Sequence, residues 1–246
     1  MELIAGIAGW FADPVHWQGP AGVPARVGEH LALSAAALVI AAAIGLAAGI
    51  WVGHTGRGAT LAVNLANLGR ALPTFAVMGI VLPVTAAIDN QAGFKVYPAV
   101  IALVVLAIPP ILVNAYAGIS GVDREIVEAG RATGMRERQL LWQVEVPLAL
   151  PVILGGLRSA TSQIIATATL AAVFGGPGLG RYLVEGYAQR NYPMMWAAVI
   201  LVGLLFGLAE VAFATVGRFV TPAGIRTGSV LPSADHRPGT IQSEAA

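Results

Sequence analysis

Five long apolar segments, separated by shorter polar ones, dominate the chain. A helix needs about 20 apolar residues to cross the hydrocarbon core of a bilayer, and each segment reaches that length. The segments are Leu31 to Val52, about Leu61 to Ile88, Val96 to Ala117, about Leu148 to Phe174, and Pro193 to about Val216. The pattern predicts an all-α, polytopic membrane protein with about five transmembrane helices.

Prolines and a few charges interrupt these apolar segments. Pro73 and Pro83 lie in the second segment, and Pro109 and Pro110 lie in the third. Backbone groups that a proline leaves unpaired must be satisfied by neighbouring helices when water is absent. We therefore expect a packed bundle rather than separate helices in lipid.

Composition supports a membrane protein and narrows its chemistry. Hydrophobic residues make up 57% of the chain and charged residues 11%, whereas soluble domains are nearer a quarter charged. A net charge of +1 argues against nucleic-acid binding, which needs a basic face. The chain has no cysteine, and its four histidines (His16, His30, His54 and His236) lack metal-ligand spacing. We expect neither a metal nor a cofactor.

Basic residues outside the spans predict the orientation. Eight lie in the loop after the first span, in a central polar block and in the tail, and four lie on the opposite side. The eight are Arg57, Arg124, Arg131, Arg136, Arg138, Arg218, Arg226 and Arg237, and the four are Arg26, Lys95, Arg181 and Arg190. An excess of Arg and Lys marks the cytoplasmic side. This predicts a protein of the cell membrane with its N-terminus outside and its C-terminus in the cytoplasm.

The two ends of the chain differ from the span region at 25–220. Residues 1–24 lack the basic start of a signal peptide, and Trp10 and Trp17 suit an extracytoplasmic or interfacial leader. Residues 221–246 are rich in Ser, Pro, Gly and Thr, which predicts a disordered cytoplasmic tail.

The central polar block, residues 122–147, holds a third of the charged residues of the chain. Asp123 is placed to cap a helix, and Val122 and Val127 have the spacing of a hydrophobic staple. Gly134 is suited to end that helix in a left-handed conformation. A generic solvated loop is the simpler alternative, but such loops do not usually combine caps, stop signals and apolar faces.

A second short helix is predicted to follow the turn. It begins near Arg136, and its apolar face consists of Leu140, Leu141 and Val144. Pro147 ends the block and is suited to open the next membrane helix. The block is therefore predicted to be a helical hairpin, with a flank at Ala129 and Gly130 bare enough for another protein to approach closely.

The stretch EAGRATGMRERQLLWQVEVP resembles the EAA motif of the membrane subunits of type I ABC importers. That motif reads Glu-Ala-Ala, three residues, Gly, nine residues, Ile-x-Leu-Pro. Glu128-Ala129-Gly130, Gly134 and Val144-Glu145-Val146-Pro147 keep its spacing, with Gly for the third Ala and Val for Ile and Leu. The resemblance implies a coupling hairpin that docks on a cytosolic ATPase, with Glu128 capping or bracing it. Coupling would involve Glu128, Ala129, Gly130, Gly134, Leu141, Val144 and Pro147.

The resemblance extends over about residues 25 to 220. Segments such as NLGRALPTFAVMGIVLPV and PLALPVILGGLRSATSQIIATATLAAVFGGPGLG are similar to permeases for glycine betaine, carnitine or choline. It implies that the chain is not itself an enzyme. Its implied partners are ATP-binding cassette subunits, a second permease chain (identical or paralogous) and an extracytoplasmic substrate-binding protein.

Three alternatives to this function remain open: an ABC importer permease for another small polar solute, an ion-coupled secondary carrier, and a membrane scaffold. An ion-coupled secondary carrier usually shows ionisable relays inside the membrane and repeated halves, and we find few intramembrane charges and no repeat. A membrane scaffold would use the hairpin merely to bind a partner.

The segment GGPGLGR at 175–181 lacks the ending of a phosphate loop and is predicted to be an external turn before a short helix.

Three charges lie within the spans: Arg70, Arg158 and Glu210. At 1.5 Å per residue, helical spacing places them at similar depth in the inner half of the membrane. An unpaired charge in a membrane is costly, so we expect Glu210 to pair with Arg158 or Arg70. The alternative is that the arginines extend separately to the inner interface while Glu210 faces a wet pathway.

Overall fold

The computed structural model describes residues 1–89 and 91–220, and within them every regular element is helical. The elements are α1 (Glu2–Ala12), η1 (Pro14–Trp17), α2 (Val23–Thr55), α3 (Ala59–Ala71), α4 (Thr74–Ile88), α5 (Ala92–Lys95), α6 (Tyr97–Ser120), α7 (Arg124–Ala132), α8 (Glu137–Leu140), η2 (Leu141–Glu145), α9 (Val146–Thr167), η3 (Ala168–Phe174), α10 (Gly180–Ala188) and α11 (Tyr192–Val220). The predicted tail lies outside the described residues.

Four of the five predicted spans are long apolar helices. They are α2, α6, the continuous helical segment Glu137–Phe174 that includes α9, and α11. The predicted second span is instead bent by 90° between α3 and α4, so the described residues hold four candidate spans, or five if that pair is counted as one. The break falls at Leu72, which is extended because the ring of Pro73 disfavours a helical conformation in the residue before it.

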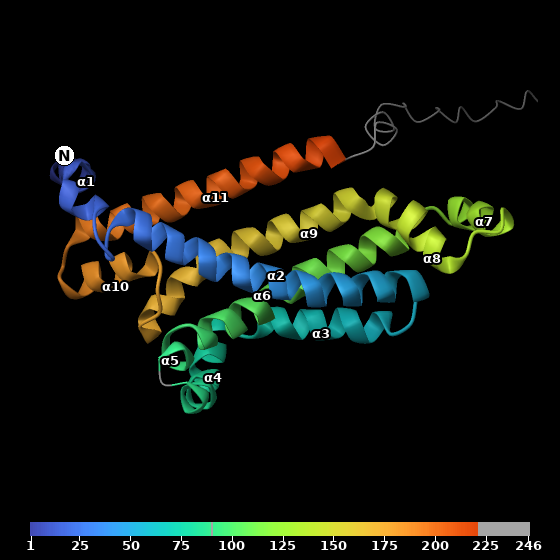
Figure 1. The fold of residues 1–246 in the computed structure, drawn as a ribbon, viewed down its shortest axis with the longest axis horizontal. Helices are drawn as coiled ribbons and strands as arrows, with labels where there is room; N and C mark the ends of the chain where they lie inside the picture. The colour runs from blue at the N-terminus through green and yellow to red at the C-terminus, as the bar shows by residue number, and fades with distance from the viewer. Residues whose placement is uncertain (90, 221–246) are drawn as a thin grey trace, which may run out of the picture.

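The long helices run side by side along one axis, and the connections collect at its two ends (Figure 1). The hairpin α7–α8 and the α2–α3 loop lie at one end, and α11 runs toward this end but finishes short of it. The N-terminus, α5 and α10 lie at the other end. Within the described residues, the elements that carry the two sets of basic residues therefore lie toward opposite ends of the bundle.

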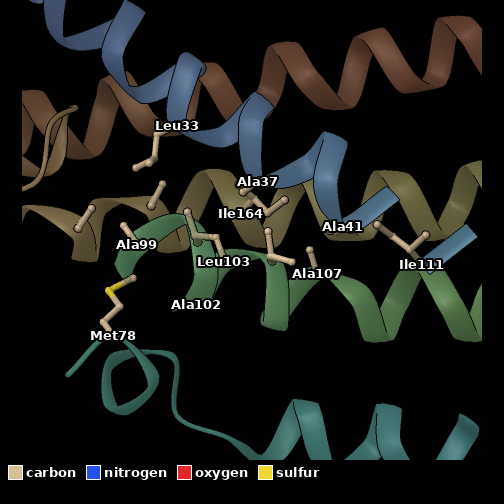
Figure 2. Packing of buried hydrophobic residues seen from close by; sticks show 14 residues of the cluster. Leu33, Ala37, Ala41, Met78, Ala99, Ala102, Leu103, Ala107, Ile111 and Ile164 are labelled. Atoms are coloured by element: carbon tan, nitrogen blue, oxygen red, sulfur yellow. The ribbon is translucent and has the colours of Figure 1, made fainter. Parts of the chain in front are cut away.

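Small residues allow the central helices to pack closely. Figure 2 shows Ala37 and Ala41 of α2 facing Ala99, Ala102 and Ala107 of α6, with Leu33, Leu103, Ile111 and Ile164 filling the space between helices and Met78 reaching in from α4. Small side chains let helix backbones approach one another closely. Close approach increases van der Waals packing, which helps to drive helix association in a membrane.

Three glycines bring α2 and α6 closest. An added Cβ would lie 2.9 Å from the Cγ2 of Ile111 at Gly45, 2.6 Å from the carbonyl oxygen of Leu112 at Gly49, and 2.7 Å from Cβ of Ile119 at Gly53. These positions recur every four residues and therefore share one face of α2. The pair α2–α6 is thus closely packed over about two turns of α2.

The leader is an ordered part of the described bundle. Trp10 of α1 is buried and packs edge-on against Tyr182 of α10, with ring centroids 5.4 Å apart. The leader also ends earlier than predicted, because α2 begins at Val23.

The glycine-rich segment 175–179 forms a turn before α10, as predicted. The N–H of Gly178 donates to the Glu29 carboxylate at 2.9 Å, and a Cβ at Gly176 would lie 2.7 Å from the Lys95 carbonyl oxygen. Close packing against the start of α2 and against α5 accounts for its glycines.

Candidate functional site: the helical hairpin

The first helix of the hairpin, α7, is capped at both ends by the predicted residues. Asp123 accepts a hydrogen bond from the N–H of Glu125 at 2.9 Å. Gly134 adopts a φ of 84°, and its N–H donates to the Arg131 carbonyl while that of Met135 donates to the Gly130 carbonyl. These two bonds form a Schellman motif, in which a glycine in the left-handed region ends the helix.

The second helix, α8, starts where the sequence predicts. The N–H of Arg136 donates to the side chain of Gln139 at 3.0 Å, which fixes the first turn. Leu140 is fully buried, and Leu141 and Val144 are half-buried. The predicted apolar face therefore packs inward.

An ion pair braces the hairpin across its turn. Arg131 of α7 donates to both carboxylate oxygens of Glu137 of α8, at 2.9 and 3.1 Å. The hydrogen bond and charge of Glu137 raise the pKa of Arg131. The resemblance had assigned this role to Glu128, but Glu128 is exposed and forms no hydrogen bond or ion pair among the described residues.

Ala129 and Gly130 differ in what they face. Ala129 is exposed, in keeping with a bare flank. A Cβ at Gly130 would lie 2.8 Å from the Cδ1 of the fully buried Leu140. The small size of Gly130 therefore allows α7 to pack closely on α8, and its part in a flank bare enough for another protein stays a prediction.

Pro147 stands at the start of the next membrane helix, as predicted. It lies in the first turn of α9, and α8 runs into α9 through the π turn η2. The N–H of Val146 donates to the Leu141 carbonyl, five residues earlier. Single π turns of this kind are frequent at functional sites. Here the turn directs Glu145 inward, where it is 5% exposed.

Sequence analysis missed the partner of Glu145. His54, in the last turn of α2, lies with its Nδ1 2.6 Å from Glu145 and its Nε2 3.5 Å from Glu137. The four histidines were considered only as metal ligands, and a separation of 91 residues hides this hydrogen bond from local sequence patterns. The sequence signal that could have indicated a buried carboxylate in need of a partner was Glu145 between two valines, Val144 and Val146.

The outer surface of the hairpin is partly apolar. Ile126 of α7 is 46% exposed and Trp142 of η2 is 56% exposed, and Glu128 and Ala129 are also exposed. Between the hairpin and the end of α2 lies a cavity of about 430 Å³ whose lining includes His54, Glu128 and Arg131. Exposed apolar side chains rimmed by charges are typical of a surface that binds another protein.

The intramembrane charges are arranged as one pair and one separate arginine. Arg158 of α9 donates through Nε to Glu210 of α11 at 2.6 Å and also through Nη2. The hydroxyl of Ser162 donates to the other carboxylate oxygen at 2.8 Å. Of the two predicted pairings, the described residues contain the one with Arg158, and Arg70 forms no ion pair there. The alternative of separately solvated charges does not describe Arg158 and Glu210.

A bundle of long apolar helices that carries a capped helical hairpin at one end defines a multi-pass membrane protein. Comparison with known families gives the particular family. A model described as binding-protein-dependent transport system inner membrane component matches residues 32–223. The chain belongs to this family, and it is a permease subunit of an ABC importer in the cell membrane.

Curated relatives match along most of their length. The chain is 31% identical over 201 residues to the glycine betaine/carnitine/choline transport system permease protein OpuCB of Bacillus subtilis (strain 168), covering 82% of this chain and 89% of the relative. It is 33% identical over 198 residues to the osmoprotectant import permease protein OsmW of Salmonella typhimurium (strain LT2), covering 80% and 91%.

A solved structure shares the fold. A chain of the inward-facing MetNI methionine ABC transporter superposes with a TM-score of 0.71 at 23% identity, covering 86% of this chain and 100% of that one. At this identity the match concerns the fold alone. The fold predicted from the sequence, that of a type I ABC importer, is confirmed.

Proposed function

We propose that this permease imports quaternary ammonium osmoprotectants such as glycine betaine, carnitine or choline, in an ATP-driven complex. The observation that carries the proposal is the match to relatives named for these solutes over about four fifths of the chain. The family model matches residues 32–223, which include the hairpin, α6, α9, α11 and most of α2.

The hairpin is proposed to dock on a cytosolic ATP-binding cassette subunit. Ile126 and Trp142 offer apolar surface for such an interface, and Glu128 and Ala129 lie exposed on α7. ATP hydrolysis would occur in that subunit. Closure of an ATPase dimer would then push the hairpin, and the hairpin would move the spans to which it is joined, α6 and α9.

A second permease chain, identical or paralogous, is proposed to complete the solute path. Four or five helices leave little room for a path inside one chain. Recognition of the solute is proposed to lie with an extracytoplasmic binding protein. Quaternary ammonium groups are bound by cages of several aromatic rings, and the close ring contacts of the described spans amount to the pair Phe75 and Phe174.

Reconstitution in liposomes tests the proposal. The permease, with the ATPase and binding protein of its own transport system, is expected to accumulate labelled glycine betaine, carnitine or choline only with ATP and binding protein, while labelled methionine serves as the control solute. Uptake driven by a proton or sodium gradient without ATP would instead indicate a secondary carrier. ATP-dependent uptake restricted to methionine would overturn the solute class.

A further inference from the structure

We propose that His54 is a positioning residue that ties the hairpin to α2, so that α2 moves with the hairpin during coupling. This inference rests on the proposed function. The chain itself joins the hairpin to α6, through Gly121, and to α9, through η2. His54 adds a third attachment, from a helix that is distant in sequence.

The geometry of His54 matches an attachment rather than a surface contact. Its side chain is 14% exposed and lies between Glu145 and Glu137. Because a carboxylate only accepts hydrogen bonds, the 2.6 Å contact requires that Nδ1 of His54 donates to Glu145. Glu137 in turn binds Arg131, so side-chain contacts run unbroken from α2 to both helices of the hairpin.

Glu145 depends on His54. It is buried, and its hydrogen-bonding partner among the described side chains is His54. A buried charge left without its partner is strongly destabilising. Any movement that separates the hairpin from α2 would leave the Glu145 carboxylate buried without its partner. Moving the hairpin and α2 together therefore costs less free energy than moving them apart.

The α2 helix is able to pass this movement on. Its last turns lie at backbone contact with α6 through Gly49 and Gly53, directly before His54. A displacement of the hairpin is therefore delivered to α2 and α6 as one unit. Without His54, the hairpin would have no side-chain hydrogen bond to α2 among the described residues.

Three variants in the reconstituted complex test the role of His54. His54→Leu removes the bond to Glu145. His54→Asn retains it, since the amide nitrogen of asparagine lies the same number of bonds from the backbone as Nδ1. Thr55→Val is the matched control, because it changes an exposed neighbour in the same turn whose hydroxyl bonds only to the Trp51 carbonyl and the Arg57 N–H.

The measurement is ATP hydrolysed per solute molecule transported, per assembled complex. His54→Leu is expected to raise this ratio by about fivefold or more, the lower end of ordinary coupling between sites, at an unchanged KM for the solute. His54→Asn and Thr55→Val are expected to keep the wild-type ratio. A wild-type ratio in His54→Leu, whatever fraction assembles, overturns the inference.

A cross-link provides an independent test. The pair His54→Cys and Glu145→Cys, in a chain that has no other cysteine, is expected to be uncoupled and then recoupled by a short bifunctional maleimide. A cross-link that blocks transport shows that the hairpin must leave α2 and overturns the inference. Absence of ATP-driven uptake in the wild-type complex would count against the proposed function instead.

Discussion

Arg158 and Glu210 lie 52 residues apart in the sequence and form an ion pair that joins α9 to α11. Ser162, one turn after Arg158, donates to the second oxygen of the same carboxylate. Glu210 therefore has a partner for each oxygen, and both partners come from α9. Charged groups within membrane helices are commonly paired in this way and mark functional regions.

Reversal of the Glu210 charge is expected to impair assembly or uptake, because Glu210→Arg places two guanidinium groups side by side. The double variant Glu210→Arg with Arg158→Glu is expected to restore part of the lost uptake. Membrane level and solute uptake are the measurements. Arg70→Glu is the control for the second change, since Arg70 lies outside this pair, and equal rescue by both would contradict a specific role for Arg158.

Gly134 is expected to be replaceable only by residues that accept a positive φ. Gly134→Val is expected to destabilise the hairpin by about 1–2 kcal/mol, the cost of a left-handed conformation for an L-residue, and Gly134→Pro more strongly. Asparagine tolerates this conformation, so Gly134→Asn is the matched control. Co-purification of the ATPase and solute uptake should fall together in the first two, and full activity in Gly134→Pro would argue against a structured turn.

Gly130 and Leu140 are expected to behave as a coupled pair. In Gly130→Ala the new Cβ contacts the Leu140 side chain, and such overpacking lowers the free energy of unfolding by about 1–3 kcal/mol. The better helix propensity of alanine offsets about 1 kcal/mol of this loss. Leu140→Ala makes room, so the double variant should lose less stability than the two single losses added together. Ala129→Ser, on the exposed flank, should lower stability by no more than the difference in helix propensity, under about 0.7 kcal/mol. Additive losses in the double variant would mean that the two residues do not interact.

Gln18 and Ser120 are expected to face opposite sides of the membrane. Both are exposed, and they lie on elements at opposite ends of the bundle. An impermeant thiol reagent on intact cells should label Gln18→Cys and leave Ser120→Cys unlabelled until the cells are opened. The reverse result would invert the orientation inferred from the arginine count.

Local sequence signals predicted the hairpin well. Asp123 and Gly134 act through bonds to residues within a few positions, and their residue types are nearly specific for a helix cap and a left-handed turn. The long apolar runs likewise predicted α2, α6, α9 and α11, because length and hydropathy alone decide whether a helix can cross a bilayer.

Features that depend on distant contacts could not be predicted in the same way. The close packing of Gly130 on Leu140 was not predicted because the sequence does not show which face of α7 meets Leu140. The contact between His54 and Glu145 depends on where α2 ends relative to the hairpin and on a π turn, which has no sequence signature. The pairing of Glu210 was predicted from the cost of a lone charge, but choosing Arg158 over Arg70 required the fold.

Gly45, Gly49 and Gly53 have a mechanical consequence. Two helices packed this closely over about two turns cannot readily slide past one another. A shift of one residue would drive the side chains of α6 into the α2 backbone. We therefore expect α2 and α6 to move as one unit, so that a solute path would open and close by displacement of other helices against this pair.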